Sequence, residues 1–268
     1  GSNQLTYELL GASVVAPLTE EGIKALALLL LLLFFRRELD SPLDGLIYGG
    51  VVGFGFAAVE NVFYLFGAYS QGGMGSALGL AFLRAGVFGL NHAMYTAFSG
   101  LGVALSLELR SVPMKVLSIL IGFALSLGTH ALHNALATFT AQSGLISLLL
   151  AVLADWAGVA VLLIVAVGAF ILERRRIAAY AEQLVSQHRL PTEEVAVLKS
   201  TLKRRVARLR PLSSGDIKRW RALQRYHAKV TEAAFAWHRL RHGDVKAQPR
   251  LTKLETEFQQ LRREAHTA

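Results

Sequence analysis

Residues 16–35 read APLTEEGIKALALLLLLLFF, an almost unbroken apolar run with Glu20, Glu21 and Lys24 near its head. The run is long enough to cross a bilayer, which takes roughly 20 residues of α-helix. Ionisable side chains at membrane depth cost a few kcal/mol each, so those that occur usually face the protein interior and mark a functional site. The stretch therefore predicts a membrane helix that carries charged groups for a chemical purpose.

The chain as a whole divides into an apolar part and a basic part. Of its 268 residues, 53% are hydrophobic and none is cysteine, so neither a disulfide nor a thiolate metal site is expected. Residues 173–268 hold 22 of the 28 Lys/Arg and 10 of the 19 Asp/Glu, a net charge of +12, against −3 for residues 1–172. We therefore expect a membrane domain over residues 1–172 and a basic, helical cytosolic domain over residues 173–268.

Five apolar stretches predict an all-α membrane bundle, with spans at approximately residues 8–35, 43–69, 78–107, 113–141 and 145–172. Basic residues lie at alternate ends of these spans: Arg36 and Arg37, Arg110 and Lys115, and residues 174–176. By the positive-inside rule, these ends face the cytoplasm. The first span then enters from the outside, and the C-terminal domain is expected on the cytosolic side of the membrane.

Gly45, Gly49 and Gly53 recur every fourth residue in the second span. In a membrane helix, such spacing makes a smooth stripe that lets a neighbouring helix approach closely. We expect the stripe to serve helix packing and to bring the polar residues of the second span near those of the first.

Each of the first four spans carries ionisable or amide side chains at a similar depth: Glu20, Glu21 and Lys24; Glu60 and Asn61; Asn91 and His92; His130, His133 and Asn134. At 1.5 Å per residue, their charged groups fall in a layer ~10 Å thick, between the midplane and the outer leaflet. Helix packing alone does not explain such convergence, so we expect a functional site. Arg84 and Asp155 are expected outside it, paired with each other or, for the arginine, reaching toward the membrane surface.

The spacing within each helix indicates the chemistry. Lys24 lies three residues after one glutamate and four after the other, so it can pair with either and leave one carboxylate available. His130 shares a helix face with Asn134 and also with His133. The functional motif of this helix is therefore either HxxxN, with Asn134, or HxxH, with His133. Two histidines with a carboxylate and an open position are the usual donors of catalytic zinc.

These residues resemble the motifs of the PrsW family of intramembrane proteases, relatives of the CAAX prenyl proteases. The matching motifs are EExxK at residues 20–24, FxxxE ending at Glu60, a histidine in the third span at His92, and HxxxN at His130 and Asn134. Asparagine at 134 is more typical of the CAAX branch, whereas glutamate at 60 favours PrsW. The resemblance covers about residues 14–140. Family members often carry further helices before EExxK, and Gly1-Ser2 looks like a cloning remnant, so we expect native segments upstream.

The resemblance implies an endopeptidase that hydrolyses a membrane-anchored protein, an anti-sigma factor in PrsW itself, near the outer half of the bilayer. One of the first two glutamates would activate the water, and the asparagine would stabilise the oxyanion or orient a histidine. The expected catalytic residues are Glu20, Glu21, Lys24 and Asn134, and the expected zinc ligands are Glu60, His92 and His130. A metal-free mechanism, in which glutamate and histidine alone activate water, stays open.

Two other classes of function are compatible with parts of the sequence. A transporter or channel also collects Glu, His and Lys at the midplane, but the spans show no inverted-repeat symmetry and no proline break at midspan. The basic run Lys203, Arg204, Arg205, Arg208 and Arg210 could contact nucleic acid. We expect it instead at anionic lipid, which attracts basic segments close to a membrane helix.

Overall fold

The computed structural model describes residues 2–35, 39 and 41–267, and these residues form helices joined by short connections, with no strand among them. The all-α prediction is confirmed. The chain divides into two compact units, residues 1–167 and 168–268. Arg36 and Arg37, which helped to orient the first predicted span, lie outside the described residues.

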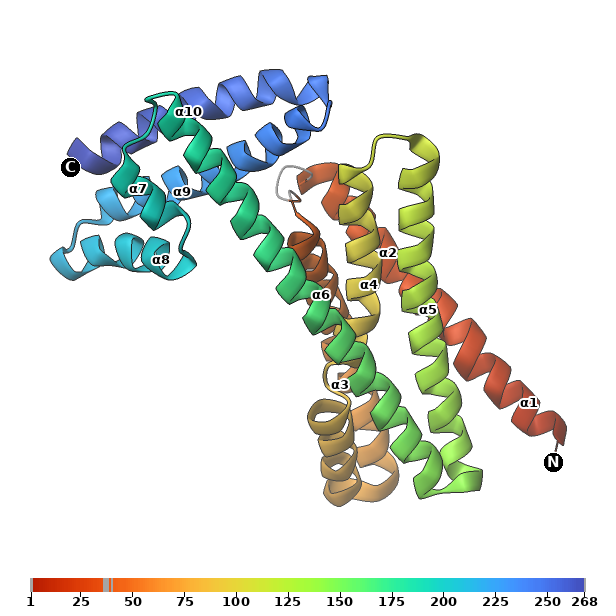
Figure 1. Ribbon diagram of the computed structural model, residues 1–268. Coiled ribbons are helices and arrows are strands. Elements are labelled where there is room, and N and C mark those ends of the chain that lie inside the picture. Colours follow the sequence, from red (N-terminus) through yellow and green to blue (C-terminus); the bar gives the residue numbers. More distant parts are fainter. Residues whose placement is uncertain (1, 36–38, 40, 268) are drawn as a thin grey trace. The chain divides into compact units, whose positions relative to one another are not determined.

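The first unit contains the N-terminal helices of Figure 1. Two of its segments are π-helical, a form that is rare and frequently found at functional sites. In chain order the elements are α1 (Ser2–Leu10), a π-helix (Gly11–Val15), α2 (Ala16–Phe35), α3 (Pro42–Ala81), a second π-helix (Phe82–Val87), α4 (Asn91–Glu108), α5 (Val112–Ser143) and α6 (Leu145–Ser186), which continues into the second unit.

Three helical stretches are long and apolar enough to cross a membrane: Pro42–Glu108, Val112–Thr140 and Leu145–Ser186. The first has 67 residues and contains both the second and the third predicted span. The first predicted span is not among the three, and its helix α2 carries two glutamates and a lysine in its first half. Large apolar side chains along the three stretches are exposed, as expected for helices that face lipid.

The third predicted span, residues 78–107, is wrong as a single helix. Gly73 has φ +67°, a left-handed conformation that glycine adopts without a Cβ clash. The segment after this turn folds back along α3, so that Arg84 reaches Glu60. The second π-helix ends at Val87 and α4 begins at Asn91. The histidine after Asn91 therefore lies in the first turn of α4 rather than in the middle of a span.

The glycine stripe of α3 packs against α4, which lies between α3 and α5 in Figure 1. The two backbones are so close that a Cβ added at any of the three glycines would overlap carbonyl oxygens on α4, those of Gly100, Thr96 and His92. Close packing through this stripe is confirmed. Its partner is α4, however, and not the helix of the first span, because the turn at Gly73 returns the chain alongside α3.

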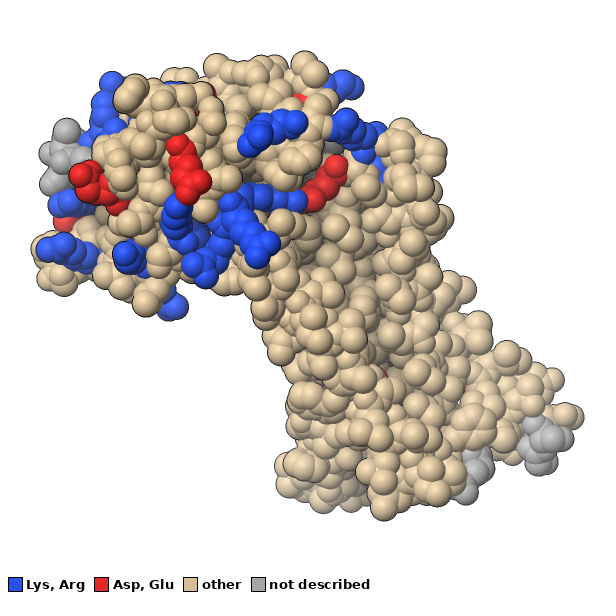
Figure 2. Space-filling model, viewed as in Figure 1, with Lys and Arg blue, Asp and Glu red and all other residues tan. Residues whose placement is uncertain are grey.

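The second unit is a helical domain of its own. Its elements are the end of α6, α7 (Thr192–Leu198), α8 (Thr201–Leu209), a 3₁₀ turn (Arg210–Ser214), α9 (Ile217–Arg241), a 3₁₀ turn (Val245–Ala247) and α10 (Gln248–Thr267). Its core joins α6, α9 and α10 through buried side chains that include Ile177, Tyr180, Leu184, Val230 and Phe258. Many Lys and Arg side chains cover its surface (Figure 2).

The contact between α3 and α4 gives a test of the fold. Gly53→Ala places a methyl group against the carbonyl of His92, and overpacking of this kind costs about 1–3 kcal/mol. We therefore expect a lower midpoint of thermal unfolding in detergent. Gly55→Ala is the matched control, because its Cβ meets nothing within 4 Å and alanine favours a helix over glycine by about 1 kcal/mol. Equal midpoints for the two variants would contradict the close contact.

Candidate active site

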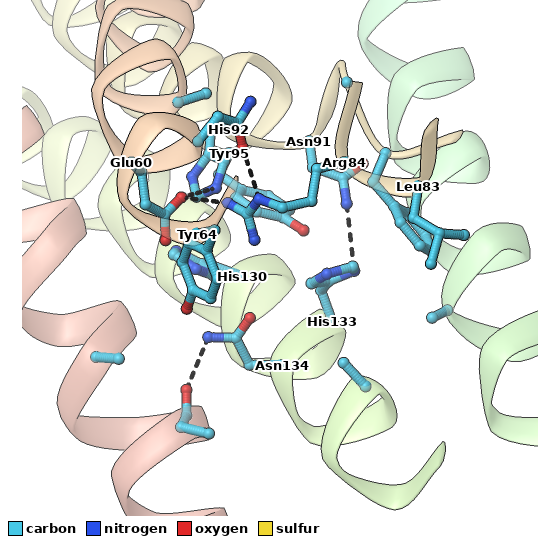
Figure 3. Close-up of a pocket in the computed structure, with 18 of the residues that line it drawn as sticks. Glu60, Tyr64, Leu83, Arg84, Asn91, His92, Tyr95, His130, His133 and Asn134 are labelled. Atoms are coloured by element: carbon cyan, nitrogen blue, oxygen red, sulfur yellow. Dashed lines mark hydrogen bonds and ion pairs between the residues drawn. The ribbon is translucent and has the colours of Figure 1, made fainter. Parts of the chain in front are cut away.

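A cavity of about 480 Å³ opens inside the first unit among α2, α3, α4, α5 and the second π-helix. Its walls carry most of the polar residues that the sequence singled out, and Figure 3 shows their side chains converging. Among the residues that line it are Glu20, Glu60, His92, His130, His133 and Asn134. The predicted convergence of four helices on one polar site is therefore present.

Glu21 lies behind the cavity wall and is 1% exposed. Its carboxylate accepts hydrogen bonds from Lys24 Nζ at 2.7 Å, Ser126 Oγ at 2.6 Å and Thr96 Oγ1 at 3.3 Å, and it lies 2.9 Å from His130 Nδ1. Because a carboxylate only accepts, His130 carries its proton on Nδ1 and keeps a lone pair on Nε2. Glu21 thus joins α2, α4 and α5 and leaves neither of its oxygens free.

Lys24 is also buried, and it connects the first glutamate pair to the histidine of α4. Its Nζ lies 3.0 Å from His92 Nδ1 and 4.1 Å from the centre of the Phe56 ring. A protonated lysine only donates, so Nδ1 accepts and the proton of His92 sits on Nε2. That nitrogen lies 2.9 Å from Glu60 Oε2. His92 is therefore oriented from both sides.

Each of the two histidines is thus held by a different carboxylate, His130 by Glu21 and His92 by Glu60. A third carboxylate, that of Glu20, lies between them. Its Oε2 is buried without a hydrogen bond, 3.8 Å from His130 Nε2 and 3.7 Å from Lys24 Nζ. Glu20 is therefore the carboxylate that the surrounding protein leaves available to a ligand.

The donor set fits a metal ion. Glu20, His92 and His130 each offer one ligand atom, and these atoms lie within 4.8 Å of one another. Two imidazoles and one carboxylate are donors that zinc accepts, and histidine ligands usually hold a carboxylate on their other nitrogen, as His130 does here. For His92, a metal would replace one of its present partners. The set differs at one position from the predicted ligands, because Glu60 is hydrogen-bonded to His92 while Glu20 faces the two rings.

Arg84 belongs to the site, contrary to the sequence-based prediction. From the second π-helix it donates to Glu60 Oε2 at 2.7 Å and to Asn61 Oδ1 at 2.6 Å, and its guanidinium covers the ring of Tyr64 at 4.0 Å (Figure 3). The predicted pairing with Asp155 is wrong, because the turn at Gly73 carries the arginine back to α3.

Asp155 of α6 forms a third histidine–carboxylate pair, with His133, a residue that lines the cavity. His133 Nδ1 lies 2.7 Å from Asp155 Oδ2, and Asn91 Nδ2 and Tyr95 OH donate to the same carboxylate at 2.8 and 3.4 Å. The Tyr95 ring stacks on His130, with ring centres 4.7 Å apart. The sequence contained a signal for this pair, since Asp155 is an ionisable residue within an apolar span.

Asn134 lines the cavity and has a structural bond as well. Its Nδ2 donates to the carbonyl oxygen of Ala12 at 2.8 Å (Figure 3). Ala12 belongs to the first π-helix, where the regular helical ladder is interrupted. Asn134 therefore ties α5 to the segment that precedes α2. The role predicted for it at the oxyanion stays a prediction.

Comparisons with known proteins identify the family of the chain. Residues 1–171 match the family described as PrsW family intramembrane metalloprotease. Protease PrsW of Clostridioides difficile (strain 630) is 41% identical over 66 residues, which are 25% of this chain and 26% of that protein. The alignment thus spans about a quarter of that relative's length. No solved structure matches the chain. Because the family match covers well over half of its residues, the chain belongs to the PrsW family of intramembrane metalloproteases.

Proposed function

We propose that this protein is an endopeptidase that hydrolyses a peptide bond of a membrane-anchored protein, and that Glu20 takes the proton from the attacking water. The observation that carries the proposal is the position of Glu20: its Oε2 is buried without a hydrogen bond, next to two histidines that other carboxylates already hold. The family match supports the same class of reaction. Glu21, whose oxygens are all engaged, has the orienting role.

The other residues of the cluster prepare this step. Glu21 and Glu60 fix the orientation of His130 and His92, and Lys24 supplies the positive charge that the buried Glu21 requires. In a zinc-bound form, Glu20, His92 and His130 would hold the ion, with one oxygen of Glu20 as the ligand and the other as the acceptor of the proton of the water. When bound, zinc supplies a Lewis acid for the water and the scissile carbonyl. In a metal-free version of the proposal, the same glutamate and histidines act directly on water and substrate.

The departing amine needs a proton, and His133 is placed to give it. Asp155 holds its Nδ1 and balances the charge of the imidazolium, so Nε2 is the nitrogen that remains for a substrate in the cavity. Water adds to the carbonyl and gives one proton to Glu20. The C–N bond then breaks, and the departing nitrogen takes the proton of His133. A proton from Glu20 restores His133 through solvent.

The membrane setting of the proposal follows from the charge pattern of the sequence. The protease domain comprises residues 1–172 in a bacterial inner membrane, and the basic domain, residues 173–268, faces the cytosol. The site then lies toward the outer half of the bilayer, and the substrate is a protein with a membrane anchor, of the kind that anti-sigma factors represent. Hydrophobic exposure along α3, α5 and α6 supports the embedded position of the first unit.

The glutamate assignment can be tested by substitution. Glu20→Gln removes the proposed base but no hydrogen bond of its buried oxygen, so we expect cleavage to fall about 10²–10⁴-fold with little change in stability. Glu21→Gln leaves a buried lysine without its closest charge partner and should cost about 3–5 kcal/mol of stability. The measurement is mass spectrometry of new termini in membrane proteins of cells that express each variant.

Glu8→Gln is the control, because Glu8 is an exposed glutamate on α1. It should leave both cleavage and stability unchanged. Full cleavage by the Glu20→Gln variant would rule out this base. Absence of any cleavage product, together with a proton flux in proteoliposomes that Glu20→Gln abolishes, would instead support a channel or transporter.

The metal can be tested independently of substrate. We expect the purified protein to hold about one zinc ion per chain by elemental analysis, as a three-donor site with an open position does. His130→Ala should lose the metal, whereas Asn134→Ala, which removes a cavity residue outside the donor set, should keep it. Cleavage by a preparation that holds no metal would contradict the zinc-bound form and leave the metal-free one.

The role of His133 predicts a separate pattern. His133→Gln and Asp155→Asn should each lower cleavage by about 10²-fold, because the leaving amine loses its proton donor, and both should retain zinc. Zinc content and thermal midpoint serve as controls for the integrity of the site. Cleavage at the wild-type rate by His133→Gln would show that another group protonates the amine.

A further inference from the structure

Helix α8 of the second unit exposes its apolar side. Leu202, Val206 and Leu209 follow a spacing of four and three residues, which places them on one face of the helix. Their side chains are 71%, 56% and 50% exposed. In a helix of a soluble domain, this face would normally pack on the core. Instead it points away from the unit's core, which α6, α9 and α10 form.

The inward face of α8 carries a charge. Arg204 is only 8% exposed and its guanidinium lies within 3.5 Å of the hydroxyls of Thr201 and Thr231. Burial lowers the pKa of Arg204 below its usual value, and the charge of Glu173 opposes this shift. A helix with leucine outside and arginine inside reverses the usual distribution. The exposed leucine and valine side chains of α8 would be more stable in contact with an apolar partner outside the unit.

Basic residues flank the exposed apolar face. Lys203, Arg205 and Arg210 are exposed beside it, and no Asp or Glu occurs between residues 195 and 215. Two further apolar side chains shortly after the helix, Leu212 and Ile217, are exposed as well. Apolar side chains bordered by Lys and Arg are the pattern of helices that lie in the headgroup region of a membrane. Figure 2 shows the concentration of positive charge on this unit.

We propose that α8, with Leu212 and Ile217, inserts its apolar face into the headgroup region of an anionic bilayer, while the flanking Lys and Arg contact lipid phosphates. Nucleic acid would be met by the basic residues but would give the leucines no partner. An anionic lipid bilayer offers acyl chains to the apolar side chains and phosphates to the Lys and Arg side chains. The proposal names the binding surface and does not depend on the protease activity.

The absence of cysteine from the chain makes a direct test possible. Val206→Cys carries a fluorophore sensitive to polarity on the α8 face, and Val245→Cys carries it at another exposed valine of the same unit. The whole protein is reconstituted in vesicles of phosphatidylcholine with or without phosphatidylglycerol, some containing spin-labelled lipid as a quencher. We expect a blue shift and quenching at 206 in the anionic vesicles and neither at 245.

Three results would overturn the proposal. Equal signals at 206 and 245 would show that α8 has no special contact with lipid. A blue shift at 206 that grows with protein concentration in detergent would assign the face to a second copy of the chain. A shift that requires added DNA would assign it to nucleic acid. As a second measurement, Lys203→Glu combined with Arg205→Glu should abolish the quenching in anionic vesicles while the unfolding midpoint of the second unit is retained.

Discussion

The buried carboxylate of Glu21 is the constraint on which the membrane unit depends. An ionised carboxylate away from water is stable only when a cation and hydrogen-bond donors surround it. Here the cation is Lys24 on the same helix, and the donors come from Ser126, Thr96 and His130 on α4 and α5. One charge therefore sets the distance among three helices. The carboxylate of Glu21 also fixes the orientation of the His130 ring. The same interaction therefore holds the helices together and positions a residue of the candidate site.

Both π-helical segments form hydrogen bonds with residues that line the cavity. In the first segment, the carbonyl oxygen of Ala12 accepts a hydrogen bond from the amide of Asn134. In the second, Arg84 donates hydrogen bonds to Glu60 and Asn61. A π-helical turn shifts the side chains that follow it by a residue relative to an α-helix. Such a shift allows a side chain to reach a partner that a regular helix would miss. Both segments are thus tied to groups that line the cavity.

The sequence was sufficient for the helical class and for the polar residues that meet at the cavity, because hydropathy and helical periodicity depend on local composition. It did not distinguish Glu20 from Glu21, since adjacent residues on a helix differ only in the neighbours that they meet. It also misplaced Arg84 and Asp155. The partner of Arg84 depends on the turn at Gly73, and a φ value of one glycine cannot be read from the apolar pattern around it.

The balance of charge within the cluster supports the role proposed for Glu20. Three carboxylates, those of Glu20, Glu21 and Glu60, face two cations, Lys24 and Arg84. Lys24 contacts Glu21 at 2.7 Å and Arg84 contacts Glu60 at 2.7 Å, so each cation is matched to a different carboxylate. Glu20 keeps only the longer contact with Lys24, at 3.7 Å, so its negative charge is the least compensated of the three. A low-dielectric site with one such charge attracts a proton or a metal cation strongly. The ion pairs that stabilise the helices therefore also leave one carboxylate for the proposed cation.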